Sequence, residues 1–280
     1  MTDPQTGHLV VCPTPIGNLE DVTLRVLSAL RAADLVACED TRRTRKLLDR
    51  HEVGAKLVSY HEHNERKRAA ELVDAMRSGK TVALVSDSGT PLVSDPGYAL
   101  VRACVAAGLE VEVLPGPSAA LTALVASGMP PDRWRFAGFL PRKKSELRKL
   151  LEEPGGTMVA FESPNRLPAT LQLLAEIDPR REAAVCRELT KAHEEVVRGT
   201  AAELRDRFAE APKGEVVLVV GPEAGGHEAA PLAAIAAVSR LVEAGAKPRE
   251  AAKVVADLTG ANANALYAVV AGGSPTSAVD

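Results

Sequence analysis

Short apolar segments alternate with helical patterns along most of the chain, and this alternation limits its possible folds more than any other feature. Several of the apolar segments have no polar position, as expected for strands that are covered on both faces. Strands that alternate with helices are typical of α/β domains with a largely parallel sheet. The expected strands are His8–Cys12, the shorter Leu35–Ala37, Thr81–Val85, Glu110–Leu114, Thr157–Phe161, Ala183–Cys186 and Glu215–Val220.

Helical periodicity fills the intervals between these strands. The predicted helices are Thr23–Ala33, Arg42–Arg50, Glu65–Ser78, Tyr98–Ala107, Ser118–Ser127, Ser145–Glu152, Asn165–Ile177 and Ala201–Ala209. An alanine-rich tail, Leu232–Val270, has turn signals at Gly245–Pro248 and Thr259–Asn264, which predict two or three short helices.

Two segments rich in Pro and Gly divide the chain. The first, Ser127–Lys144, is interpreted as a linker and holds three of the eight aromatic residues, and the second is Gly221–Pro231. A chain of 280 residues is long enough for more than one domain. We expect two α/β domains at residues 8–128 and 129–224, followed by a small helical domain at 228–275.

Rigid turns follow most of the predicted strands. They are Pro13–Gly17, Ser86–Gly97, Pro115–Ser118, Glu162–Arg166, Arg187–Lys191 and Gly221–Pro222. Open parallel sheets bind ligands beyond the carboxyl ends of their strands, and rigid turns hold backbone groups in place before binding. A cleft between the two domains is therefore expected. The turn Ser86–Gly97, SDSGTPLVSDPG, has no Lys or Arg, which argues against a phosphate site.

Common site motifs are missing from the sequence. There is no GxGxxG after the first strand, no GxxxxGK[ST], no HExxH and no clustered Cys and His. His61 and His63 have no third ligand at a suitable spacing, and the serines near Asp87 and Asp95 have no GxSxG context. We therefore expect no metal site, no standard dinucleotide or P-loop site and no hydrolase triad.

Composition bounds the class of protein. Apolar residues make up 46% of the chain and the net charge is −3, so it is globular and has no overall basic character for nucleic acid. The start MTDPQTGHLVV lacks the features of a signal peptide, no apolar run has the length of a membrane span, and the four cysteines are scattered among apolar residues. A soluble cytoplasmic protein that does not bind membranes is expected.

Five segments, in this order, carry a resemblance to a known family. They begin with PTPIGNLEDVTLRVLSALRAADLVACEDTRRTRKLL and continue with VALVSDSGTPLVSDPG, PGPSAALTALVASGMP, FAGFLP and RELTKAHEE. Together they resemble the tetrapyrrole methylase superfamily of S-adenosylmethionine-dependent methyltransferases. Within it, the chain is similar to the ribosomal small-subunit methyltransferase I family, which methylates the ribose 2′-oxygen of a cytidine in 16S rRNA. The porphyrinoid-methylating relatives instead start with G-x-G and carry a GDP motif.

The resemblance implies a binding site for S-adenosylmethionine between two α/β domains of the tetrapyrrole methylase type. The matching positions in the first domain are Pro15, Ile16, Gly17, Asp87, Gly89, Thr90, Ser118 and Ala119, and those in the second are Phe161 and Glu188. A ligand with a cationic sulfonium and a zwitterionic end suits a loop of carboxylate, hydroxyl and backbone groups. Methyl transfer to a hydroxyl gains from a general base, and the candidates are Glu39, Asp40, Lys191 and Glu194.

A substrate of 16S rRNA or an assembled small subunit would need a local basic surface. Two clusters are candidates for contacts to RNA phosphates: Arg42, Arg43, Arg45 and Lys46, and then Arg142, Lys143, Lys144, Arg148 and Lys149, with Arg166 and Arg187 added from the strand-end turns. The family also implies a homodimer. Two alternatives stay open: a porphyrinoid methyltransferase of the same superfamily, and a non-catalytic ribosome-binding relative.

Overall fold

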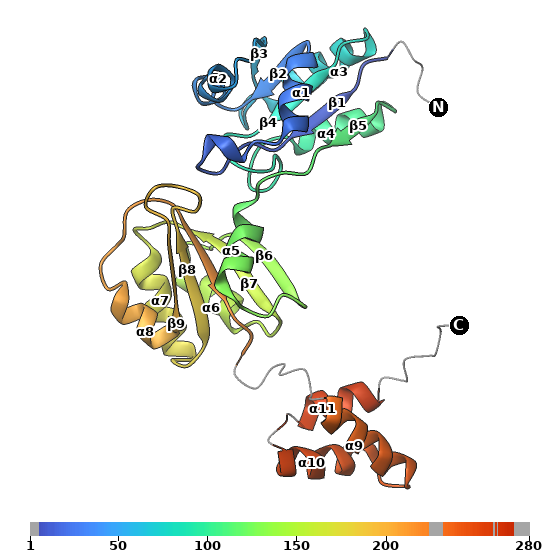
Figure 1. The fold of residues 1–280 in the computed structure, drawn as a ribbon, viewed down its shortest axis with the longest axis vertical. Helices are drawn as coiled ribbons and strands as arrows, with labels where there is room; N and C mark the ends of the chain where they lie inside the picture. The colour runs from blue at the N-terminus through green and yellow to red at the C-terminus, as the bar shows by residue number, and fades with distance from the viewer. Residues whose placement is uncertain (1–5, 224–231, 260, 262, 272–280) are drawn as a thin grey trace.

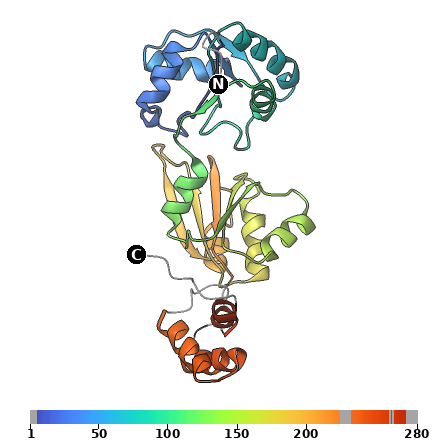
Figure 2. The same cartoon turned by 90° about the vertical axis from the view of Figure 1, so that its right-hand side faces the viewer.

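The structure is a computed structural model that describes residues 6–223, 232–259, 261 and 263–271. It has three parts, which follow one another along the long axis in both views (Figures 1 and 2). The first part is a five-stranded sheet in the order β3-β2-β4-β1-β5, in which all paired strands are parallel. Its strands are β1 (Leu9–Cys12), β2 (Leu35–Cys38), β3 (Leu57–Ser59), β4 (Val82–Val85) and β5 (Val111–Val113).

Both faces of this sheet are buried, as the continuous apolar strands predicted. Helices α1 (Leu24–Ala32) and α2 (Thr41–Arg50) pack with one face, and α3 (Glu65–Arg77) and α4 (Tyr98–Ala106) cover the other. A short 3-10 turn, η1 (Leu19–Asp21), precedes α1. The carboxyl ends of the strands all point the same way, so the turns after β1, β4 and β5 meet at one edge.

The second sheet has the order β6-β7-β10-β8-β9. Only β6 and β7 are parallel; β10 is antiparallel to β7 and β8, and β8 is antiparallel to β9. The expectation of a largely parallel sheet is therefore wrong for this domain. The strands are β6 (Trp134–Phe139), β7 (Thr157–Glu162), β8 (Glu182–Arg187), β9 (Glu195–Thr200) and β10 (Val216–Val220).

Helix α5 (Ala119–Ser127) covers one face of this second sheet. Its buried side chains share a core with Val159, Ala184 and Val219, while α6 (Lys144–Glu152), α7 (Leu167–Ile177) and α8 (Ala201–Arg207) pack on the other face. The interpretation of Ser127–Lys144 as a linker is wrong, because β6 lies within it. Because α5 packs with the second sheet, we propose that the domain boundary lies near Pro117 rather than at residue 128.

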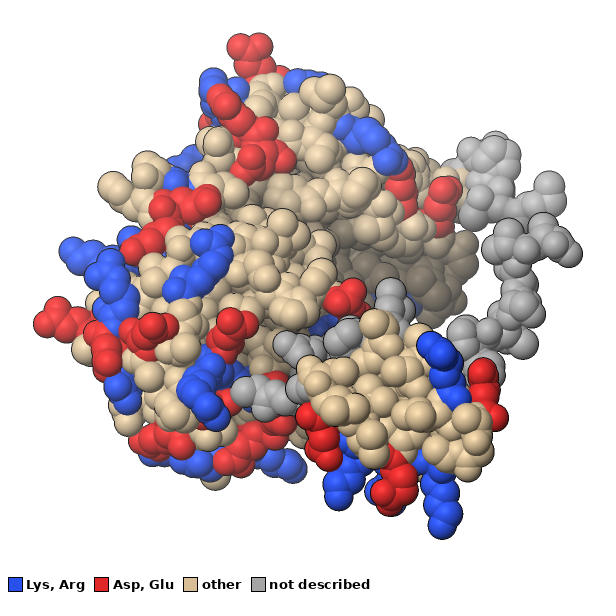
Figure 3. Space-filling model, turned by 60° about the horizontal axis from the view of Figure 1, so that its bottom comes forward, with Lys and Arg blue, Asp and Glu red and all other residues tan. Residues whose placement is uncertain are grey.

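The tail forms three helices with a small core of their own, as its turn signals predicted. They are α9 (Leu232–Glu243), α10 (Pro248–Thr259) and α11 (Ala263–Ala271), and their shared core includes Val238, Ala252, Val255 and Leu266. The expected second break, Gly221–Pro231, lies largely outside the described residues. Cationic and acidic side chains are interspersed over the face shown in Figure 3, which presents no continuous basic surface. In the described part of the chain, no helix is long and apolar enough to cross a membrane.

Candidate active site

Three turns of the first domain are joined at the carboxyl edge of its sheet. Thr14 and Gly89 exchange two backbone hydrogen bonds of 2.8 and 3.0 Å, and the Thr14 hydroxyl donates to the carbonyl of Ser86 at 3.0 Å. The Thr90 hydroxyl donates to the carbonyl of Pro117 at 3.1 Å. Gly89 has φ +81°, which a side chain would strain, and a Cβ there would lie 3.3 Å from Ile16. The turns after β1, β4 and β5 therefore form one rigid wall.

A pocket of about 370 Å³ lies between this wall and the second sheet. First-domain residues Ile16, Gly89 and Thr90 line it together with Ser118 and Ala119 at the start of α5, and second-domain residues Phe161, Leu189 and Val217 line the far side. The cleft expected between two α/β units is thus present. The turn Gly221–Pro222 is not part of it, because antiparallel β10 carries its carboxyl end to the opposite edge; the turn before β10 lines the pocket instead, at Gly214 and Glu215.

The charged side chains that line the pocket are acidic, and two of them are paired with cations outside the lining: Glu162 with Arg166 at 3.5 Å and Glu215 with Lys191 at 3.0 Å. Asp95, Glu162 and Glu215 line it together with the hydroxyls of Ser88, Thr90, Ser94, Ser118 and Ser163, and its described lining contains no Lys, Arg or His. Glu162 is fully engaged: it accepts hydrogen bonds from the Ser163 amide at 2.7 Å and the Thr170 hydroxyl at 2.6 Å. Such a pocket favours a cationic ligand over a phosphate.

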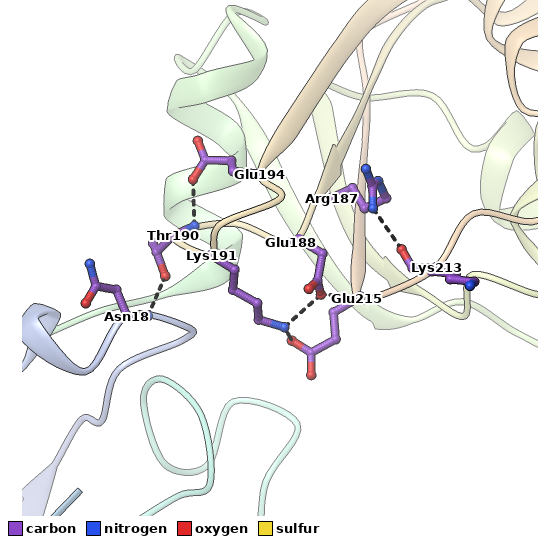
Figure 4. Close-up of polar contacts among 8 residues, drawn as sticks. All are labelled: Asn18, Arg187, Glu188, Thr190, Lys191, Glu194, Lys213 and Glu215. Carbon is purple, nitrogen blue, oxygen red and sulfur yellow. Dashed lines mark hydrogen bonds and ion pairs between the residues drawn. The ribbon is translucent and has the colours of Figure 1, made fainter. Parts of the chain in front are cut away.

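The two domains touch beside the pocket where the turn after β1 meets the turn after β8. The Asn18 amide donates to the Thr190 hydroxyl at 3.0 Å (Figure 4). A Cβ on Gly17 would lie 2.6 Å from both Thr190 Oγ1 and Lys191 Cγ, and 2.8 Å from the carbonyl of Leu189. Gly17 does not line the pocket. Its lack of a side chain allows the second-domain turn to pack against it.

That second-domain turn is held by an ion-pair cluster, seen in Figure 4. The Lys191 ammonium lies 2.7 Å from Glu188 Oε1 and 3.0 Å from Glu215 Oε2, and the Glu215 amide also donates to Glu188 at 2.9 Å. Glu188 and Thr190 have positive φ, a conformation that costs energy for residues other than glycine. The cluster fixes the backbone in this conformation.

Not all predicted donor contacts lie in the pocket. Ile16, Gly89, Thr90, Ser118, Ala119 and Phe161 line it, whereas Pro15, Gly17, Asp87 and Glu188 do not. Asp87 instead accepts a hydrogen bond from the Asp40 amide at 3.0 Å and pairs with Arg43 at 3.6 Å. Its carboxylate therefore stabilises the start of α2 in this structure. Glu188 is occupied by Lys191 and by the Glu215 amide.

None of the four predicted bases lines the pocket, so they are poorly suited to proton transfer there. Asp40 caps α2, and its hydrogen bonds with Arg42 hold the pKa of its carboxyl well below the ordinary value. For Lys191, burial lowers the pKa, but its two carboxylate partners together raise it above the ordinary value, so it stays charged. Glu194 accepts a hydrogen bond from the Thr190 amide at 2.6 Å, and Glu39 is exposed.

Asp95 is the pocket carboxylate that sequence reasoning did not select. Burial first, and then the charges of Glu39 and Asp87, raise its pKa to about 6. Its loop is strained, since Leu92 and Ser94 both have positive φ (72° and 68°). Perturbed titration and backbone strain beside a pocket are features of functional sites. The only sequence signal was the second Asp of SDSGTPLVSDPG, which is indistinguishable from a turn-forming residue.

Most of the predicted RNA contacts are occupied by protein groups. Arg187 pairs with Glu195, and Arg166 donates to the carbonyls of Leu140 and Pro141 at 3.0 and 2.6 Å and pairs with Glu162. The others with partners are Arg42 with Asp40, Arg43 with Asp87, Arg45 with the carbonyl of Ala55, Lys143 with Glu146, Lys144 with Glu176, and Arg148 with Glu152 and Glu176. Lys46, Arg142 and Lys149 are exposed and have no ion pair with the described residues.

Comparison with known proteins places the chain in a family. Residues 8–205 match the family model of Tetrapyrrole (Corrin/Porphyrin) Methylases. The chain belongs to this family. It is 47% identical to a ribosomal RNA small subunit methyltransferase I of Mesorhizobium japonicum over 94% of this chain and 91% of that protein. The Thermotoga maritima protein of the same name is 45% identical over 76% of this chain and 98% of its own length.

Solved structures agree on the fold. The methyltransferase CobJ superposes with a TM-score of 0.60 at 25% identity, covering 78% of this chain and 95% of that chain. A uroporphyrin-III C-methyltransferase from Thermus thermophilus, solved as a complex with S-adenosylhomocysteine, superposes with a TM-score of 0.54 at 20% identity, covering 77% of this chain and 97% of that chain. The expected fold of two tetrapyrrole-methylase domains is confirmed. No group of three or more His, Cys, Asp or Glu that could hold a metal ion occurs among the described residues.

Proposed function

We propose that this protein transfers a methyl group from S-adenosylmethionine to the 2′-hydroxyl of a cytidine in 16S rRNA. The chain belongs to a methyltransferase family. Its relatives include a ribosomal RNA small subunit methyltransferase I that is 47% identical, which supports methyl transfer to rRNA. The observation that carries the proposal is the interdomain pocket, which has a rigid wall of turns and acidic side chains in its lining. Ribose and cytidine specificity rest on the family resemblance in the first-domain motifs.

The described pocket fits S-adenosylmethionine. The apolar side chains of Ile16, Ala119, Phe161 and Val217 suit an adenosine moiety, and the carboxylates suit a ligand that carries a sulfonium and an ammonium group. When bound, the donor supplies an electrophilic methyl group on sulfur. The chain's task is then to hold the acceptor hydroxyl in line and to exclude water, which is how positioning lowers a barrier.

Asp95 is the group that we propose as the general base. It lines the pocket, and its pKa of about 6 leaves it charged at neutral pH but able to accept a proton. As the new C–O bond forms, the S–CH3 bond of the donor would break, its sulfur would leave as a neutral thioether, and the 2′-hydroxyl proton would pass to the Asp95 carboxylate. This role replaces the one expected for Glu39, Asp40, Lys191 or Glu194.

The alternative of a porphyrinoid substrate has weaker support. The solved uroporphyrin-III C-methyltransferases that resemble this chain are 20–26% identical to it, whereas the Mesorhizobium japonicum rRNA methyltransferase is 47% identical. A non-catalytic ribosome-binding relative would not need the pocket with its preserved turns. An rRNA substrate also favours the cytoplasm as the site of action.

A second copy of the chain is proposed as a partner. Several exposed apolar side chains lie on α4, the edge strand β5 and α5, namely Tyr98, Val105, Val113, Leu121 and Val125. Exposed apolar groups of this kind mark interaction surfaces. Light scattering should give a dimer mass, and Val125→Glu should give a monomer. Leu258→Glu, on the exposed face of α10, is the matched control, and a wild-type monomer at micromolar concentration would contradict the proposal.

The function is tested by methyl transfer to small subunits that lack the modification. Purified protein and labelled donor should place one label per subunit on a cytidine ribose, mapped by resistance of the neighbouring phosphodiester to alkaline cleavage. Saturable donor binding by calorimetry is the independent control. Label on a base, or binding of donor without transfer to any RNA, would overturn the assignment.

A further inference from the structure

Strand β6 contains a bulge that changes the direction of one aromatic side chain. Phe136 pairs with Val159, but Phe139 pairs with Phe161, so three steps along β6 match two along β7. Gly138 supplies the extra residue with φ +64°. Because side chains alternate between the faces of a strand, the insertion brings Phe139 onto the face of Phe136. Bulges commonly direct side chains in this way next to active sites.

Phe139 lies at the rim of the pocket and remains open to solvent. It lines the pocket, yet it is 66% exposed. Its ring meets the half-buried Phe161 ring edge to face, with centroids 5.4 Å apart, and Phe161 meets Phe136 in the same way at 4.9 Å. Phe161, which itself packs against Phe136, therefore supports the Phe139 ring, while most of the surface of Phe139 is available to a ligand.

The position of Phe139 is fixed relative to the proposed base. A Cβ on its neighbour Gly138 would lie 3.7 Å from Ser94 Oγ, so the bulge lies against the loop that carries Asp95. Phe139 and Asp95 line the same pocket, so a ligand that covers the Phe139 ring lies in the pocket that contains Asp95. Three residues after Phe139, Arg142 is exposed and makes no ion pair or hydrogen bond with the described residues.

We infer that Phe139 stacks on the nucleobase of the acceptor nucleotide and that Arg142 contacts a neighbouring phosphate. This inference rests on the proposed function and names how the RNA is held. Proteins that read single-stranded RNA stack unpaired bases on aromatic rings and neutralise the backbone with basic groups. An exposed ring at the rim, beside the proposed base, favours the acceptor base over the adenine of the donor, for which the deeper Phe161 surface is available.

The first test separates acceptor binding from donor binding. Phe139→Leu should lower kcat/KM for small subunits about 5- to 150-fold, the range for stacking of one base, and leave the donor Kd within twofold. Phe139→Trp should restore the activity. Trp134→Leu, on the same strand but outside the pocket lining, is the matched control and should behave as wild type. An unchanged kcat/KM in Phe139→Leu, or a donor Kd weakened by the same factor, would overturn the inference.

The second test uses the single tryptophan of the chain. In the variant Trp134→Phe with Phe139→Trp, a 16S rRNA fragment containing the acceptor cytidine should quench the fluorescence, and a fragment with an abasic site there should quench it much less. Quenching by S-adenosylmethionine alone would assign the ring to adenine and overturn the inference. If the double variant shows this quenching but the wild type does not methylate the fragment, the proposed function fails while the stacking site stands.

Discussion

The Asn18 amide and the Thr190 hydroxyl, 3.0 Å apart, join the turn after β1 to the turn after β8. This bond lies next to Gly17, where an added Cβ would lie within 3 Å of three residues of the second domain. The pocket is lined from both sides of this contact, so its shape depends on the spacing that the contact maintains. The first prediction concerns that spacing.

Gly17→Ala should separate the domains at this contact. Its methyl group would meet Thr190 Oγ1 and Lys191 Cγ at 2.6 Å and the Leu189 carbonyl at 2.8 Å, distances that force the backbone to move. We expect donor affinity, measured by calorimetry, to fall at least about tenfold, or about 1.4 kcal/mol. Gly54→Ala, where a Cβ meets nothing within 4 Å, is the control. Unchanged donor binding in Gly17→Ala would show that the contact does not set the pocket.

Asp95→Asn should lower the methyl-transfer activity and raise the free energy of unfolding at neutral pH. The carboxyl of Asp95 has a raised pKa of about 6 in the fold, against an ordinary value of 3.8. Below the ordinary value both states hold the proton and the group has no effect on stability. As pH rises from there to about 6, the unfolded state loses its proton first, so folding stability falls and then levels off. The asparagine variant lacks this loss.

Urea unfolding at two pH values tests this sign. Asp95→Asn should be more stable than wild type at pH 7.5 and nearly equal to it at pH 4, while methyl transfer falls at least about a hundredfold. The wild-type rate should rise through pH 6 and then level off. A variant that is destabilised at pH 7.5, or that keeps its activity, would contradict the assignment of Asp95.

Arg166 and Arg142 should give opposite results when each is replaced by alanine. Arg166 holds the Leu140 and Pro141 carbonyls and faces Glu162, which is 3% exposed. Arg166→Ala should therefore cost about 2–3 kcal/mol of unfolding free energy. Arg142→Ala should leave the melting temperature unchanged. It should reduce the slope of log K for RNA binding against log salt concentration by about 1. Equal effects of both variants on melting temperature would refute this division.

The described core of two domains should bind the donor without the helical tail. Helices α9–α11 have a core of their own, and the Thermotoga maritima relative matches only 76% of this chain with 98% of its length. A chain ending at Glu223 should keep its donor Kd within twofold of the full chain. Loss of donor binding in a folded truncated chain, judged by circular dichroism, would show that the tail supports the pocket.

The sequence predicted the central strands better than the edge strands. β1, β4, β7, β8 and β10 are buried and were visible as apolar runs. The missed strands β3, β6 and β9 all lie at sheet edges and are at least partly exposed, so their side chains are mixed and carry no clear period. Strand direction was also hidden, because the apolar run of β10 reads the same whether its neighbours are parallel or antiparallel.

Some residues of the candidate site could also be predicted from the sequence, and others could not. The Pro- and Gly-rich turns pointed to the wall formed by Gly89 and Thr90, since turn chemistry is local. The proposed roles of Asp95 and Phe139 depend on burial, on neighbouring charges and on a bulge, none of which is visible in a short motif. Asp87 was selected by its motif position, and in the fold its carboxylate accepts a hydrogen bond from the Asp40 amide.

The chain passes from the first domain to the second once, through the residues just before α5. Pro117 in this crossing accepts the Thr90 hydrogen bond, and Ser118 and Ala119 line the pocket immediately after it. The only covalent hinge between the domains is therefore also part of the binding wall. Any rotation of one domain against the other must change the pocket itself, so ligand occupancy and interdomain angle are mechanically coupled through this peptide.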